Sequence, residues 1–446
     1  MSEIKLQQIE ELKAEAIANL ESNDDELQIG ACSQLSRFFI GFGGINPPSE
    51  GFISGIVPRL LEFLDRDDYP KLQLAATRAI AYISLESSDN IHINILIEQG
   101  AVPTVVSLLS SPTDEHHGEL EDELNLHYEY YRYSLQVDDT EKRCAQWKTP
   151  VLISQSLSEL KLLHALVVLG TIASVSAKYR DFVLSHGVLM PLLEQFNDKT
   201  NLTIMGQATE TLSKLCLRKP QFEQVKSAIL PLAHVIHTDD QIVLKHACEA
   251  LFHLTCGEMD MKQAVIDAGA FPRLFELLLS VKKSLSSVVR RYRKSYILYV
   301  RIVDNIISYV DDTQIQAVIE AGIISPLLPL LQDADLFNAA AEVIYNVTTK
   351  GTNEQIRFLV HEGCIEPMCD LLVKPNEAHV IKIYLEGLEN ILKVGEAEKN
   401  QGNTEDVNVF AQMIVDARGL EKIKNVQTHD NSKIREQAEK ILETYW

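Results

Sequence analysis

Several features are scarce or absent in this sequence of 446 residues, and each absence narrows the class of protein. Lys and Arg number 41 against 63 Asp and Glu, which gives a formal charge of −22. Such a charge disfavours direct binding to nucleic acid through its phosphates and favours basic protein partners, although the solubility of a large chain would explain it equally well. The seven cysteines have no paired spacing, which indicates free thiols in a reducing compartment.

Membrane, secretory and catalytic signatures are also missing from the sequence. No apolar run reaches about 18 residues, and the first residues include acidic side chains without an apolar signal region, so we expect neither a membrane span nor secretion. There is no glycine-rich phosphate loop, GxSxG motif, HExxH motif or Cys/His metal spacing. We therefore expect no enzyme activity, no cofactor and no metal, and a location in the cytosol or the nucleus.

The stretch from Gln355 to Lys399 contains the pattern that organises the chain. Its opening run IRFLV is apolar at helical spacing, and Gly363 follows as a helix stop. Pro367 then opens a second short helix, because proline is tolerated in a first turn but not further inside. A third, longer helix carries apolar residues at helical spacing, namely Ile381, Ile383, Leu385, Leu388 and Ile391.

This three-helix pattern recurs along the chain with a period near forty residues. Related segments read LIEQGAVP, VLSHGVLMPLLEQ and KQAVIDAGAFP, and prolines fall at the corners of the units at positions 58, 103, 191, 231, 272, 326 and 367. A period of about forty residues with short helices and Gly–Pro corners is typical of armadillo repeats. The sequence therefore predicts an all-α fold, an armadillo-repeat right-handed α-solenoid.

Two corner intervals break the rhythm. The 88-residue interval between prolines 103 and 191 holds an acidic, tyrosine-rich insertion at 113–156, which we predict to be a disordered loop, either an unconstrained insertion or an attractant for a basic partner. The 54-residue interval between prolines 272 and 326 lacks about thirty residues of a repeat, so we expect about nine repeats. We assign 1–26 to an N-terminal helix with an acidic turn and 27–446 to the solenoid.

The segments LEGLENILKVGEAEK, VLSHGVLMPLLEQ, KPQFEQVK and LIEQGAVP resemble importin-α, the adaptor family that carries basic nuclear localisation signals. The resemblance extends from about Leu27 to Trp446. Family members normally begin with an Arg/Lys-rich segment that binds importin-β and covers the cargo groove. Here the first 25 residues contain only Lys5 and Lys13 as basic residues, so docking to importin-β is not carried over.

In the family, the third helices line a groove, and each ideally offers a Trp and, four residues later, an Asn. The spacing places both on one helix face, where indoles bind the stems of Lys and Arg and the Asn amide holds the peptide backbone. None of these pairs is present in the four repeats of the implied major site. The corresponding pairs are Arg78 and Tyr82, Val167 and Thr171, Glu210 and Lys214, and Glu249 and His253. We expect this mode of binding to be lost, with Arg78 and Lys214 adding positive charge to the groove.

The C-terminal half keeps more of the family pattern and implies a residual cargo-peptide site. Its residues are Arg301, Asn305, Asp311, Glu342, Asn346, Glu386 and Asn390. Glu342 stands at a Trp position, and the missing repeat would have supplied a central Trp–Asn pair, so these residues are either an active remnant or inherited and unused. The resemblance also implies that the last repeats dock the export receptor of importin-α.

The leading hypothesis is therefore an importin-α-like adaptor that binds basic nuclear localisation signals for protein import, with an eroded major site. One alternative is a diverged armadillo scaffold for another protein partner that no longer carries cargo. A decaying duplicate with little function is a third. Affinity for a basic signal peptide separates the first hypothesis from the others.

Overall fold

The computed structural model describes most of the chain as helix. The described residues are 3–42, 48–85, 90–110, 156–197, 200–270, 324–332, 337–373, 378–402 and 406–446, together with scattered positions between 272 and 322. No β-strand occurs among them. The chain divides into two compact units, Met1–His253 and Leu254–Trp446, and each is described by itself.

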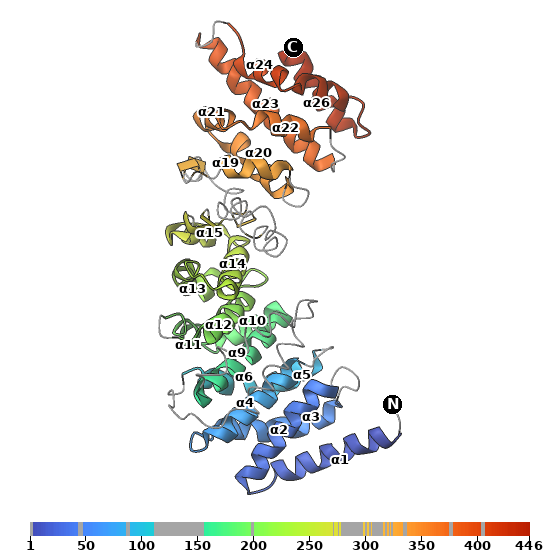
Figure 1. The fold of residues 1–446 in the computed structure, drawn as a ribbon, viewed down its shortest axis with the longest axis vertical. Helices are drawn as coiled ribbons and strands as arrows, with labels where there is room; N and C mark the ends of the chain where they lie inside the picture. Colours follow the sequence, from blue (N-terminus) through green and yellow to red (C-terminus); the bar gives the residue numbers. More distant parts are fainter. Residues whose placement is uncertain are drawn as a thin grey trace. The chain divides into compact units, whose positions relative to one another are not determined.

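The first unit is a succession of helices in which adjacent helices, and the long helices of successive repeats, pack on one another (Figure 1). Its helices are α1 (Glu3–Leu20), α2 (Asp25–Phe42), α3 (Glu50–Leu64), α4 (Pro70–Leu85), α5 (Ile91–Glu98), α6 (Ala101–Leu108), α9 (Leu157–Val175), α10 (Ala177–Ser185), α11 (Leu189–Leu193), α12 (Leu202–Leu215) and α13 (Phe222–Val235). The last helix, α14 (Gln241–Thr255), extends two residues past the division.

The second unit repeats the same succession of short and long helices. Its elements are α15 (Met259–Asp267), α19 (Ile324–Leu327), the 3₁₀ helix η1 (Leu328–Gln332), α20 (Phe337–Lys350), α21 (Asn353–His361), α22 (Ile365–Leu371), α23 (Ala378–Asn400), α24 (Val409–Asp416), α25 (Gly419–Val426) and α26 (Ser432–Tyr445). Within this unit α20 packs on α23, and α23 packs on α26.

The unit predicted at 355–399 is confirmed as α21, α22 and α23. Thr352 starts α21 with a capping box, in which its hydroxyl accepts from the amide of Gln355 while the Gln355 side chain accepts from the amide of Thr352. Gly363 has a φ of +91°, a left-handed conformation that a residue with a Cβ adopts only at a cost, and it separates α21 from α22. A local signal therefore starts and stops each helix.

The long helices of the first unit form its core. Helix α4 packs on α2 and on α9, and α9 packs in turn on α12. Helix α9 is apolar on all sides and has the length and composition of a membrane span, but 67% of its most apolar window is buried inside the structure. Its composition is explained by packing between two neighbouring helices, as expected for a core helix.

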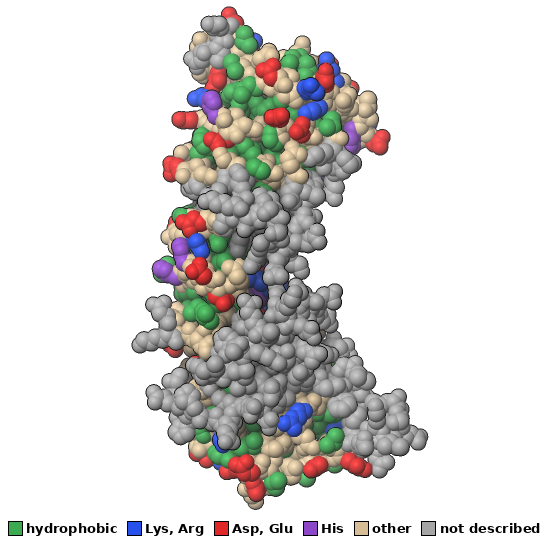
Figure 2. Space-filling view, in the orientation of Figure 1, with side chains coloured by type: hydrophobic (Ala, Val, Ile, Leu, Met, Phe, Trp, Pro, Cys, Tyr) green, Lys and Arg blue, Asp and Glu red, His purple; other side chains and the backbone are tan. Residues whose placement is uncertain are grey.

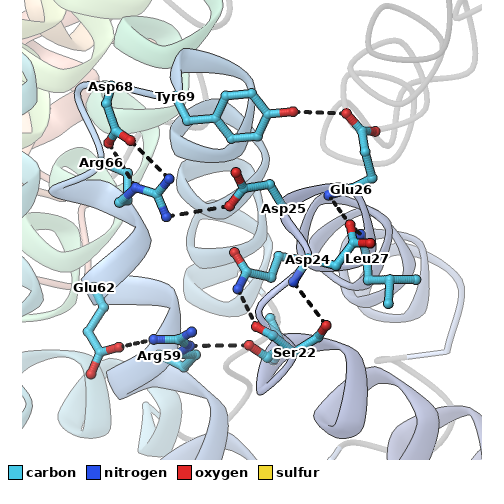
Figure 3. A network of polar contacts seen from close by, with 12 residues as sticks. Ser22, Asp24, Asp25, Glu26, Leu27, Arg59, Glu62, Arg66, Asp68 and Tyr69 are labelled. Atoms are coloured by element: carbon cyan, nitrogen blue, oxygen red, sulfur yellow. Dashed lines mark hydrogen bonds and ion pairs between the residues drawn. The ribbon is translucent and has the colours of Figure 1, made fainter.

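The predicted N-terminal helix is present as α1 and is tied to the first repeat. The backbone carbonyl of Leu20 accepts a hydrogen bond of 3.2 Å from Nε of Arg59 in α3. Tyr69 donates to Glu26 at 2.8 Å, and Arg66 lies 3.5 Å from Asp25 (Figure 3). The acidic turn predicted at the end of this segment includes the first turn of α2, where Asp25 and Glu26 are also placed favourably for the helix dipole.

Two other predictions concern parts of the chain with little or no description. The insertion at 113–156 lies outside the described residues except for Ser156, which caps α9 together with Glu159. The count of about nine repeats depends on the join between 272 and 326, where only scattered positions are described. Both stay predictions.

Candidate functional site

Arg78, expected as a cation in the binding groove, is instead buried in the core. Its exposed fraction is 0%, and its guanidinium donates from Nη2 to the hydroxyl of Ser33 at 2.9 Å and from Nε to that of Ser36 at 3.4 Å. Both serines belong to α2, on which α4 packs. The prediction that Arg78 repels a cationic ligand in the groove is therefore wrong, because its guanidinium is buried and hydrogen-bonded inside the fold.

The next positions of the presumed major site also present little to a ligand. Tyr82 and Val167 are each only 3% exposed, and the ring of Tyr82 meets that of His164 edge-on at 6.3 Å. The hydroxyl of Thr171 donates to the backbone carbonyl of Val167 at 2.8 Å. The side chains at the two expected groove positions of α4, and at those of α9, therefore pack in the core or bond to their own helix.

Farther along the first unit, the acidic positions carry their own counter-ions. Glu210 pairs with Lys214 at 2.8 Å, one turn apart on α12. Burial would raise the pKa of Glu210, but Lys214 and the basic groups of α14 outweigh it and hold the pKa below its usual value. On α14, Glu249 accepts from His246 at 2.9 Å. Burial lowers the pKa of His253 and so disfavours its charged form.

In the second unit, only one residue of the predicted pair Arg301 and Asn305 has a side chain that is open to a ligand. Arg301 is exposed. The side-chain amide of Asn305 donates to Thr255 Oγ1 and to Cys256 Sγ, both at 3.2 Å, and its backbone carbonyl accepts from the buried Lys262 at 2.9 Å. Asn305 thus holds the end of α14. The predicted acidic partner, Asp311, lies outside the described residues.

A cleft of about 500 Å³ lies among the third helices α20, α23 and α26 of the second unit. Its lining residues are Tyr345, Thr349, Glu386, Glu389, Asn390, Lys393, Lys433, Glu436, Gln437 and Lys440. Two predicted residues, Glu386 and Asn390, belong to this set. Glu342 and Asn346 lie on α20 outside the lining, and Asn346 is only 8% exposed.

The cleft combines hydrogen-bonding groups with both signs of charge. Tyr345 hydrogen-bonds Glu386, and burial together with that carboxylate raises the pKa of the phenol. Asn390 accepts from Lys393 at 3.2 Å, while its amide NH₂ group is a further donor. On the face drawn in Figure 2, acidic, basic and hydrophobic side chains are likewise interspersed over the C-terminal unit. Such a cleft can hold a peptide by its backbone and its charged side chains.

Comparison with known proteins decides the family. Residues 408–446 match a family model described as an atypical Arm repeat. Importin subunit alpha-1b of Oryza sativa subsp. japonica is 39% identical, over 99% of this chain and 80% of the relative. Importin subunit alpha-2 of Arabidopsis thaliana is also 39% identical, over 95% of this chain and 77% of the relative. The chain belongs to the importin-α family.

Solved structures support the fold of this importin-α family member. A crystal structure of an engineered protein has a TM-score of 0.61 at 22% identity and covers 97% of this chain and 98% of its own. A structure from work on a phosphorylation switch that controls the interaction between cadherin and beta-catenin has a TM-score of 0.66 at 12% identity and covers 96% of this chain and 67% of its own. The predicted all-α armadillo solenoid is confirmed.

Sequence reasoning missed most of the residues that line the cleft of this importin-α relative. Tyr345 stands directly before the predicted Asn346, and Glu389 stands directly before Asn390. The contribution of α26 follows a helical stripe, because Lys433, Glu436, Gln437 and Lys440 recur at intervals of three and four residues. That stripe was available as a signal, but nothing local indicated that α26 faces α23.

No metal or thiol chemistry emerges from the described part of this importin-α relative. It contains no group of three or more His, Cys, Asp or Glu residues arranged to hold a metal ion. Its described cysteines are free, and most are buried. Burial raises the pKa of Cys32 and of Cys216 to about 12, so both thiols are protonated near neutral pH and poorly reactive.

Proposed function

We propose that this protein is an adaptor of the importin-α type that binds basic nuclear localisation signals of other proteins and moves with them between cytoplasm and nucleus. The cleft among α20, α23 and α26 is the binding site in this proposal. The observation that carries it is the presence, in one open cleft, of the acidic side chains of Glu386 and Glu389 beside the amide of Asn390.

The chemistry of the cleft suits an extended basic peptide. The Asn390 side chain offers both a donor and an acceptor, so it can hold a peptide backbone without reading the side chains. Carboxylates beside it can pair with ammonium or guanidinium groups through charge-assisted hydrogen bonds. The aromatic face of Tyr345, on the neighbouring helix, can cover the aliphatic stem of a lysine or arginine.

The first unit contributes less to cargo binding in this proposal. The Trp positions of its third helices hold Arg78, Val167, Glu210 and Glu249, so no indole slot for a cation is present there, and Arg78 and Val167 are buried. Buried aromatic anchors at the centre of an interface typically contribute about 2 kcal/mol or more each, so the loss of several removes most of the affinity of such a site. The proposal therefore keeps an eroded major site and a working C-terminal one.

The importin-α family also suggests a partner other than cargo. We propose that the last repeats also dock the export receptor of importin-α, through the acidic end of α23 where Glu396 and Glu398 lie. Both are only partly buried, and Glu398 pairs with Arg357 at 2.6 Å across to α21. The proposal does not include importin-β as a partner.

A second candidate function is a scaffold for another protein that carries no cargo. It is favoured by Asn305, whose amide is engaged with Thr255 and Cys256 and not presented to a ligand. In that case the inherited groove residues stabilise the fold, and the partner surface lies elsewhere.

The two candidates are separated by titrating a fluorescent bipartite basic signal peptide into the purified protein at physiological salt. Low salt is avoided because the charge of −22 would attract any basic peptide. Under the adaptor proposal the peptide binds with micromolar or tighter affinity, and the double variant Glu386→Gln, Asn390→Ala weakens binding at least about tenfold, the effect of losing about 1.4 kcal/mol.

The matched control is Glu210→Gln, which removes the same charge from a third helix of the first unit. The adaptor proposal expects this variant to bind the peptide within about twofold of the wild type, since Glu210 does not line the cleft and substitutions at distant sites act independently. Absence of binding by the wild type, or equal loss in both variants, would reject the adaptor function and leave the scaffold.

A further inference from the structure

Glu389 is the most deeply buried charged group of the cleft. Its side chain is only 9% exposed, although it belongs to the lining. Two lysines meet the same carboxylate oxygen: Lys440 Nζ of α26 at 2.8 Å and Lys393 Nζ of α23 at 3.2 Å. Their hydrogen bonds and charges outweigh burial and hold the pKa of Glu389 below its usual value, so the carboxylate is ionised at neutral pH.

The lysine side chains of this contact can move, whereas the Glu389 side chain is held in place. The side chains of Lys440 and Lys393 are 67% and 55% exposed, so each can turn into solvent at little cost. Glu389 lies within a long helix that packs on both α20 and α26, and its buried carboxylate cannot leave with them. An incoming cation can therefore take the place of a lysine, whereas an incoming anion would have to compete with a carboxylate that stays in position.

We propose that Glu389 is the base of a subsite that takes one lysine or arginine side chain from a basic partner segment, and that Lys440 fills this subsite as a displaceable internal cation in the free protein. The inference rests on the proposed function, because it names the residue of that cleft which selects for a cation and the residue which competes with the ligand. Neither Glu389 nor Lys440 was among the cargo-peptide residues that the resemblance implies.

The surroundings of Glu389 fit a long cationic side chain. Tyr345 and Thr349 line the cleft from α20, and Asn390 follows Glu389 directly on α23. An aliphatic stem can lie against the ring of Tyr345 while its charged end reaches the carboxylate. Lys393 stays as a counter-ion when Lys440 is displaced, so the buried charge is never left alone.

The test uses fluorescein-labelled hexalysine as the probe, with hexaarginine and hexaglutamate as further arms, in polarisation titrations of the full chain at physiological salt. Lys440→Gln is compared with Lys433→Gln, which removes the same charge from the same helix and the same cleft but has no ion pair with Glu389. Because the exposed Lys440 is only weakly held, Lys440→Gln should bind hexalysine about threefold to fivefold more tightly than Lys433→Gln does.

The same comparison is then made in a Glu389→Gln background, which keeps the side-chain volume while removing the charge. We expect weaker binding of hexalysine and no remaining difference between the two lysine variants. Thermal unfolding of each variant verifies that the fold is retained. Hexaarginine should follow hexalysine, and hexaglutamate should not bind.

The outcomes separate this inference from the function on which it rests. Equal effects of Lys440→Gln and Lys433→Gln, or a difference that persists with Glu389→Gln, would overturn the subsite while leaving the cleft as a basic-peptide site. Binding of hexaglutamate in preference to hexalysine would also overturn it. If no variant binds a basic peptide at all, the proposed function fails as well.

Discussion

Arg78 is a residue whose role in the structure differs from the role that the sequence predicted. By its position in the repeat it was expected to face a ligand, yet it lies fully buried with its guanidinium against Ser33 and Ser36. A buried charged group is tolerated only where hydrogen bonds satisfy it, and these small hydroxyl side chains of α2 leave both the space and the acceptors. Arg78 is thus a packing residue of the first unit.

Truncation of Arg78 should therefore affect stability more than ligand binding. Arg78→Ala leaves a cavity and deprives the two serines of their donor, so we expect the free energy of unfolding to fall by about 3 kcal/mol. Chemical denaturation followed by circular dichroism measures it. Lys71→Ala, at an exposed position of the same helix, should change stability by no more than about 0.5 kcal/mol. Similar small losses in both variants would contradict the buried role.

At the scale of elements, the junction between α23 and α24 depends on a close approach. Asn408 caps α24 by accepting from the amide of Ala411 at 3.1 Å, and its own amide donates to the carbonyl of Leu392 in α23 at 3.0 Å. A Cβ on Gly395 would stand against the Asn408 side chain and 3.2 Å from Cβ of Phe410. Glycine at this point of the helix allows the cap to sit against α23.

Substituting this glycine should reverse the usual effect of removing a glycine from a helix. Alanine is normally favoured by about 0.5–1 kcal/mol in helix interiors, and Gly55→Ala in α3, where a Cβ meets nothing within 4 Å, should raise stability by that amount. Gly395→Ala should instead lower it by about 1–2 kcal/mol, through loss of the Asn408 cap. Thermal unfolding of both variants provides the measurement, and stabilisation by both would refute the close-approach argument.

At the scale of the whole molecule, histidines and carboxylates change the stability of the fold in two different pH ranges. Burial lowers the pKa of His92 and of His253 below the ordinary value of 6.5. Glu210, Glu249 and Glu389 have a lowered pKa as well, but their ordinary value is 4.5, so their effect begins at more acidic pH. Between pH 6.5 and pH 4.5, the histidines therefore contribute most to the change of stability with pH.

The direction for His92 follows from proton linkage. Above pH 6.5 the residue is neutral in both states, and as the pH falls below that value the unfolded chain binds the proton first, so stability is lost. We expect the stability advantage of the wild type over His92→Gln to shrink between pH 7.5 and pH 5.5, whereas reduced repulsion within the acidic chain affects both proteins alike. Thermal midpoints across this range would measure the difference, and a constant difference would argue against a buried neutral His92.

Local features of the sequence were enough for the repeat architecture. Apolar spacing, Gly363 and Pro367 predicted α21, α22 and α23, since helix starts and stops depend on a few neighbouring residues. The resemblance to importin-α implied Glu386 and Asn390 as site residues, and both line the cleft. Whether they bind cargo stays a prediction, as do the roles of Arg301, Asp311, Glu342 and Asn346.

The sequence by itself therefore determined the all-α repeats and the acidic balance, because each of these depends on composition or on contacts within a few turns, and its resemblance to importin-α supplied two residues of the candidate cleft. Only the tertiary structure decided that Arg78 is buried, that Asn305 holds the end of α14, and that Lys440 reaches Glu389. These contacts join residues 42 to 51 positions apart, about one repeat. Their formation depends on how neighbouring repeats stack, and periodicity within a single repeat carries no information about that stacking.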